Sequence, residues 1–330
     1  MKTFFIVVAL LLMTGPFCHA QSKVAKKIAS PKDVNATLDF PGEGRKGKNG
    51  RGFSANLTLL EQPIKKVALV SFYVFDPGYT SSFSVSSPTV KTTHIKRRNT
   101  GGLSADIAVG ALDQSYEVLK KGFSECGMEL LMPWEFLDSD AKKTAYSNFK
   151  VEQESNFSNW LQGVGAANHN LVYGYPEGFN LLDISKEPFA NYEKKGLFAV
   201  KKDAVQDKKV FYMNKDTKMT ETLGYDLATA LGVDAVVISY ITAWAPSDKK
   251  IMLENVNLTM FGPNPVMPEE SKHGMVPHVK GQFYVGTRAV IEEVLFDYNK
   301  KDESSQSLDF TGLDHIYSAL VTEMCSYIAK

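Results

Sequence analysis

The chain has 330 residues, of which 44% are hydrophobic, and its 37 Lys and Arg balance 37 Asp and Glu. This length fits one large domain or two ordinary ones, and the apolar fraction excludes disorder for most of the chain. A formal net charge of zero gives no global field that would attract nucleic acid or an anionic membrane, so either ligand would need a local patch. We expect no nucleic-acid partner, no cofactor and no metal.

The N-terminal twenty residues have the three parts of a secretory signal peptide. Lys2 precedes an apolar stretch over residues 4–13, and small residues precede a cleavage site after Ala20. The stretch is too short for a membrane anchor, which needs about 20 apolar residues. The bulky Phe17 before Cys18 argues against a lipoprotein. We predict an exported mature chain without a transmembrane segment, periplasmic or outer-membrane-associated if the source is a bacterium.

Removal of this signal peptide would leave two cysteines, Cys126 and Cys325. In an oxidising compartment such an even pair permits one disulfide. The alternative is that each cysteine is a small buried hydrophobic residue near a helix end.

Residues 21–60 are rich in Lys, Gly, Ser and Pro, a composition that predicts a flexible arm. The cations at its centre could hold phosphate, but they lack the spacing of a phosphate-binding loop, so a solvated arm is the favoured interpretation.

Residues 61–330 are expected to form a single α/β domain. Its first strand is predicted at residues 67–75, which are almost all apolar or aromatic, and Ser/Thr-rich residues 79–102 are interpreted as a long loop or an exposed hairpin. Apolar residues then recur at helical spacing over residues 103–126. Gly127 ends this helix, and a second strand follows at residues 128–132.

Residues from about 138 to 209 are interpreted as a helical insertion, with helices around 141–160 and 184–195. The helix-to-strand pattern then returns, with a helix over residues 223–231, Gly232 as its end, and a strand at 235–241. A helix that ends in Gly and leads directly into an apolar strand is typical of parallel α/β units.

The C-terminal third is expected to add antiparallel strands and a helix. Alternation over residues 251–260 predicts a hairpin with one solvated face and a bulge near Asn255. A further strand is predicted at 282–285, which residues 287–298 either continue or follow as a helix. An amphipathic C-terminal helix is predicted at 313–328. The fold class is α/β, a three-layer-like mixed sheet with flanking helices.

Three residues are candidates for a ligand-binding site. Asp76 follows the first strand at its carboxyl end, where α/β folds place ligands, although Asp-Pro-Gly is also a common turn. His169 stands between two asparagines, and His273 lies in a Pro-rich loop. Neither histidine has the spacing of a metal site, so surface or structural roles are favoured for both. Aromatic residues in polar segments are candidates for contacts with a protein or sugar: Phe53, Tyr79, Phe83, Tyr175 and Phe179.

The order of these elements resembles the envelope α/β domain shared by the amino-terminal domain of TolB, the curli secretion lipoprotein CsgG and the penicillin-binding-protein activator LpoB. The segments that carry the resemblance are residues 66–72, 119–131 and 227–237, the last reading Leu-Ala-Thr-Ala-Leu-Gly-Val-Asp-Ala-Val-Val. The resemblance implies a non-catalytic envelope protein that docks on other proteins and self-associates. Gln21 stands where the lipoprotein members carry an acylated Cys, which argues against a membrane-anchored channel.

Three functions remain open at this point. The first hypothesis is an exported binding or assembly module of the bacterial cell envelope that catalyses no reaction of its own. Its partners would be envelope proteins or a second copy of itself. The second is an exported hydrolase whose dispersed site gathers Asp76, His169 and His273. The third is a small-ligand or glycan binder that uses the crevice near Asp76.

Overall fold

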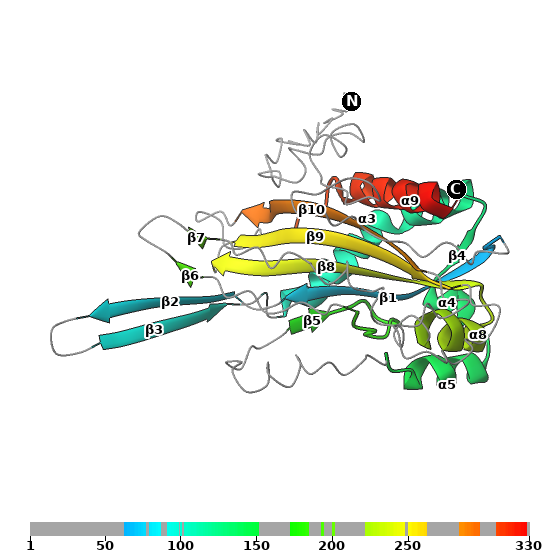
Figure 1. Ribbon diagram of the computed structural model, residues 1–330, viewed down its shortest axis with the longest axis horizontal. Coiled ribbons are helices and arrows are strands. Elements are labelled where there is room, and N and C mark those ends of the chain that lie inside the picture. Colours follow the sequence, from blue (N-terminus) through cyan, green and yellow to red (C-terminus); the bar gives the residue numbers. More distant parts are fainter. Residues whose placement is uncertain are drawn as a thin grey trace, which may run out of the picture.

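A mixed sheet between two layers of helices forms the centre of the protein, as the computed structural model in Figure 1 shows. The structure describes residues 63–76, 79–86, 91–98, 100, 102–151, 172–184, 193–194, 200–201, 222–247, 250–262, 284–297 and 308–328. The predicted α/β fold class is confirmed. The predicted signal peptide and arm lie outside the described residues.

The central strand of the main sheet is β1 (Lys66–Asp76). It pairs in parallel with β4 (Glu129–Leu131) and β8 (Ala235–Ser247). Antiparallel strands complete the sheet: β5 (Val172–Gly174) pairs with β1, β9 (Lys250–Phe261) with β8, and β10 (Tyr284–Asp297) with β9. The sheet is therefore parallel around β1 and antiparallel toward β10.

Helices cover both faces of this sheet (Figure 1). The first layer contains α3 (Leu103–Glu125) and α9 (Leu313–Ile328). The second layer contains α4 (Pro133–Phe136), α5 (Asp140–Asn148), the π-helical turn η2 (Thr222–Leu227) and α8 (Ala228–Leu231). Because helices lie on both sides, β1 is buried on both faces, which explains why its sequence is apolar without alternation.

Several predicted elements are confirmed. Strands β2 (Tyr79–Ser86) and β3 (Lys91–Arg98) pair as a hairpin, one of the two predicted alternatives for this segment. The register between β8 and β9 shifts at Glu254, beside the predicted bulge position Asn255. The strand that begins at Tyr284 continues to Asp297, so the helical alternative for that segment is wrong.

One expectation is wrong, and the two predicted insertion helices are only partly covered by the described residues. The predicted solvated face of β9 does not exist over residues 256–261, because the polar side chains of Asn257 and Thr259 are as fully buried as their apolar neighbours. Most of the second predicted insertion helix, around 184–195, lies outside the described residues. At its end, β6 (Glu193–Lys194) is a short strand that pairs with β7 (Val200–Lys201). The first insertion helix, predicted around 141–160, is present as α5 but already ends at Asn148.

An irregular segment, residues 175–184, lies against the second face of β1 and is held there by side chains. The Ser71 hydroxyl donates to the Asn180 carbonyl at 2.7 Å and accepts the Leu182 N–H at 3.1 Å. The Tyr146 hydroxyl of α5 donates to the Val70 carbonyl at 2.6 Å and accepts the Asn180 N–H at 2.8 Å. These side-chain bonds pair backbone groups that have no partner in a neighbouring strand. They allow an irregular segment to occupy a buried position.

We expect Gly174→Ala to destabilise the protein by about 2 kcal/mol because of overpacking. A Cβ atom at Gly174 would lie 2.1 Å from the Ser104 carbonyl carbon and 2.2 Å from the Ala105 nitrogen, both backbone atoms of α3. Urea denaturation of the wild type and of Gly174→Ala measures the difference in the free energy of unfolding. Gly102→Ala is the matched control, since nothing lies within 4 Å of its added methyl group. Equal midpoints for the two variants would contradict the expectation.

Candidate functional site

Asp76 lies at the carboxyl end of β1, as predicted, but its side chain is fully buried. Its carboxylate accepts a hydrogen bond from the N–H of Thr100, whose hydroxyl is in turn hydrogen-bonded to the hydroxyl of Ser104 in α3. Thr100 follows β3, so Asp76 connects the base of the β2–β3 hairpin to the first turn of α3. A buried carboxylate used in this way offers no surface to a ligand, which counts against the crevice hypothesis.

The other predicted site residues are placed as follows. His169 and His273 lie outside the described residues, so the dispersed hydrolase site stays a prediction. Cys126 and Cys325 are joined by a disulfide that connects the end of α3 to α9. Among the described residues, no group of three or more His, Cys, Asp or Glu side chains is arranged to hold a metal ion.

An exposed aromatic surface lies where α4 meets α3. The Trp134 side chain is 60% exposed. Its ring centroid lies 6.1 Å from that of Tyr116 in α3 and 6.4 Å, edge to face, from that of the buried Phe179. We call Trp134 and Tyr116, with Phe179 next to them, the Trp134 surface. A large aromatic side chain that is held by other rings yet open to solvent is a common anchor for a partner.

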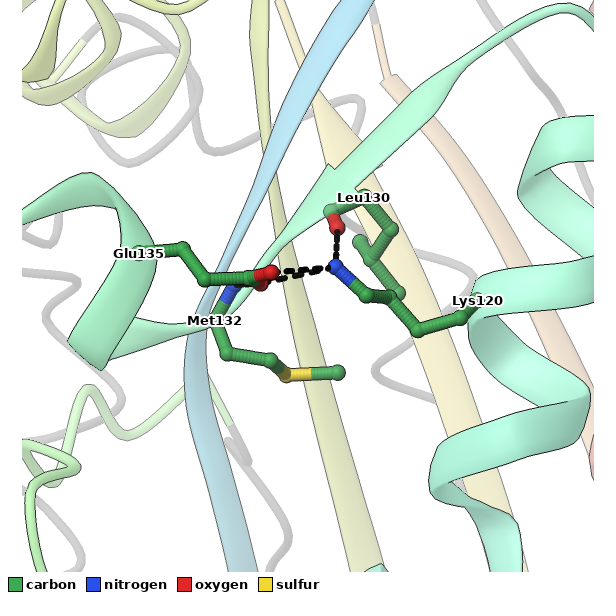
Figure 2. Close-up of polar contacts among 4 residues, drawn as sticks. All are labelled: Lys120, Leu130, Met132 and Glu135. Atoms are coloured by element: carbon green, nitrogen blue, oxygen red, sulfur yellow. Dashed lines mark hydrogen bonds and ion pairs between the residues drawn. The ribbon is translucent and has the colours of Figure 1, made fainter.

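A polar clamp fixes the position of α4 on α3 (Figure 2). The Lys120 ammonium donates to both carboxylate oxygens of Glu135 at 2.7 Å and to the Leu130 carbonyl at 2.7 Å. Glu135 also accepts the Met132 N–H at 2.7 Å. Lys120 and Glu135 are next to the aromatic pair, because Lys120 follows Tyr116 by one helical turn and Glu135 directly follows Trp134.

The clamp matters because α4 is too short to be stable as an isolated helix. Pro133 occupies its first turn, where a missing N–H costs nothing, and the Glu135 carboxylate serves the otherwise unpaired N–H of Met132. The sequence of α4 and the contact with Lys120 therefore both stabilise this short helix. Trp134 lies on a helix that is held in place, and not on a loose loop.

We expect Lys120→Met to lower the free energy of unfolding by about 1 kcal/mol, since it removes charge-assisted hydrogen bonds between partly buried groups. It should also raise the quenching of Trp134 fluorescence by acrylamide, measured as the difference from the same protein carrying Trp134→Phe. Lys121→Met is the matched control, because Lys121 forms only a 3.7 Å pair with Glu125 and both side chains are well exposed. Identical behaviour of the two methionine variants would exclude a role for the clamp.

Trp134 is not among the aromatic residues that the sequence singles out. Of those that are, Phe179 is buried in the structure and Tyr175 is 45% exposed. The missed signal was a Trp directly after Pro133, at the first turn of a helix that follows a strand. An amphipathic pattern cannot be recognised in four residues, so the exposure of Trp134 required the structure.

In the described part of the chain, the helices are each too short or too polar to cross a membrane. Comparisons of the chain with protein-family models, with curated proteins and with solved structures found no match.

Proposed function

We propose that this chain is an exported protein of the bacterial cell envelope that binds envelope proteins, or a second copy of itself, and catalyses no reaction of its own. The observation that carries this proposal is the Trp134 surface. Partner binding would bury an exposed Trp ring that already rests on Tyr116 and needs little reordering. Trp and Tyr are enriched among residues that dominate the energy of protein interfaces, and low ordering entropy favours affinity.

Two further features support the proposed location. The N-terminal sequence has the pattern of a secretory signal peptide. The Cys126–Cys325 disulfide would persist in an oxidising compartment and would be reduced in a cytosol. The resemblance to the TolB, CsgG and LpoB domain supports a role in docking or assembly.

Site-specific photocrosslinking in the source cell tests the proposal. A benzoylphenylalanine replaces Trp134 in the full chain, and a matched control carries it at Lys143, whose side chain is 59% exposed on α5. We expect a discrete protein adduct from position 134 and none from 143. An adduct with twice the mass of the mature chain, which is smaller than the 36.5 kDa full chain, identifies self-association. Adducts of equal yield at both positions, or none at 134, would overturn the proposal.

Location is tested separately by fractionation and N-terminal sequencing. We expect a mature chain that begins at Gln21 and is found in the envelope fractions. A chain that keeps its first residues and remains in the cytosol would exclude the export part of the proposal while leaving the Trp134 surface intact.

A further inference from the structure

The β2–β3 hairpin extends beyond the end of the main sheet (Figure 1). Its strands pair antiparallel over eight residues each, from Tyr79 opposite Arg98 to Ser86 opposite Lys91. The base of the hairpin is held to the domain, because Asp76 precedes β2 and accepts the N–H of Thr100 after β3. The hairpin is thus a projecting two-stranded ribbon with an anchored base.

The charge of this ribbon differs from that of the rest of the chain. Residues 79–98 contain Lys91, Lys96, Arg97 and Arg98, and they contain no Asp or Glu. The chain as a whole is neutral, so the remaining residues carry a compensating excess of negative charge. The ribbon is therefore the kind of local basic patch that a neutral protein needs to bind a polyanion.

The strand register divides the ribbon into two unlike faces. On one face Tyr79 stands opposite Arg98, Ser81 opposite Lys96, and Phe83 opposite His94. Successive residues of a strand alternate between faces, so this face combines aromatic and basic residues. The other face holds the hydroxyl-rich positions of β2, which are Thr80, Ser82, Ser84 and Ser86, together with Lys91, Thr93, Ile95 and Arg97 of β3.

The basic and aromatic positions of the Tyr79 face are also spread along the ribbon. Lys96 and Arg98 lie two residues, about 7 Å, apart along β3, and Tyr79 and Phe83 lie four residues, about 14 Å, apart along β2. A small anion contacts only one of these positions, whereas a polymer with repeated charges and rings reaches several of them. The arrangement along this face therefore favours a polymeric ligand.

We propose that the β2–β3 hairpin binds an anionic polysaccharide through the face that carries Tyr79, Phe83, Lys96 and Arg98. The basic residues pair with sulfate, phosphate or carboxylate groups, and the aromatic rings lie against the apolar faces of sugar rings. A polysaccharide is favoured over nucleic acid because the signal peptide predicts an extracytoplasmic location. This binding site is separate from the Trp134 surface and does not depend on it.

The test is a binding titration of the mature chain from Gln21 with heparin and with alginate, which carry sulfate and carboxylate groups, respectively. Neutral dextran and single-stranded poly(dT) are the comparison ligands. We expect binding to heparin and alginate that weakens steeply as salt rises, and no binding to dextran. Binding to poly(dT) that is tighter than binding to both polysaccharides would overturn the choice of ligand, and binding to none of the anionic polymers would overturn the site.

Two double variants locate the site. Lys96→Ala with Arg98→Ala should weaken polysaccharide binding at least ten-fold and reduce its salt dependence. Lys121→Ala with Lys143→Ala removes the same charge from well-exposed positions on the helices and should change affinity less than two-fold. Equal losses in the two variants would show that net charge, not the hairpin, determines binding.

Two more variants test the assignment to one face. Lys91→Ala with Arg97→Ala removes two charges from the opposite face of the same hairpin and should cost clearly less affinity than the Lys96 and Arg98 changes. Phe83→Ala should weaken binding about equally at low and high salt, since it removes a contact without charge. Melting temperatures are measured for every variant. Equal losses from both faces among folded variants would overturn the assignment to this face.

Discussion

Replacement of Cys126 and Cys325 by Ala should lower the free energy of unfolding by about 3–5 kcal/mol. The disulfide joins residues 199 apart in sequence, and closing so long a loop in the unfolded chain accounts for about 5 kcal/mol of stabilisation. In the native state, the two helices that the disulfide joins are already in contact. Gly122 lies next to Val321 one helical turn before the two cysteines, so α3 and α9 are in close contact there without the bond.

The measurement is urea denaturation of the double variant and of the wild type, with and without a reductant. Reduced wild type should unfold at the midpoint of the double variant, and the reductant should not change the variant itself. A mature wild-type chain, denatured without reductant, should contain no titratable thiol. Equal midpoints for oxidised and reduced wild type would contradict the expectation, as would two free thiols per chain.

The parts of the fold that the sequence predicted are those with long, regular patterns. The apolar run of β1, the helical spacing of α3 and α9, and the Gly232 junction all follow from burial and periodicity. The left-handed conformation of Gly232, with φ of 67°, shows why a glycine ends that helix. Such signals depend on many residues at once, so a single exception does not remove them.

The errors came from residues whose surroundings are set by distant parts of the chain. Asn257 and Thr259 have the polarity of a solvated strand face, yet both are fully buried. Asp76 lies at the end of a strand where ligands often bind, but its carboxylate accepts the N–H of Thr100, which follows the β2–β3 hairpin in the sequence. Trp134 lies three residues after the end of β4, in a short helix that Lys120 of α3 contacts through Glu135. None of these partners is visible in the local sequence.

Above pH 10 the protein should lose stability, by about 3 kcal/mol at pH 11, because of two buried tyrosines. Burial raises the pKa of Tyr317 and of Tyr146 well above the ordinary value. In the unfolded chain both phenols ionise near pH 10, while in the native state they stay protonated. The unfolded state therefore binds fewer protons as pH rises, and the free energy of unfolding falls from the unfolded pKa upward until the native groups ionise. Below about pH 9 both groups are protonated in both states, so they produce almost no pH dependence there.

Tyr317→Phe isolates half of this effect. The hydroxyl of Tyr317 is hydrogen-bonded to that of Ser239 at 2.9 Å, and the Ser239 hydroxyl also donates to the Asn257 carbonyl. After the change, Ser239 therefore keeps one hydrogen-bond partner. The ring of residue 317 can still stack on Phe72. We expect a loss of less than about 1 kcal/mol at pH 7 and, between pH 9 and 11, about half the decline of the wild type. Tyr175→Phe, at an exposed position, is the control. A Tyr317→Phe curve parallel to that of the wild type over this range would show that Tyr317 ionises equally in both states.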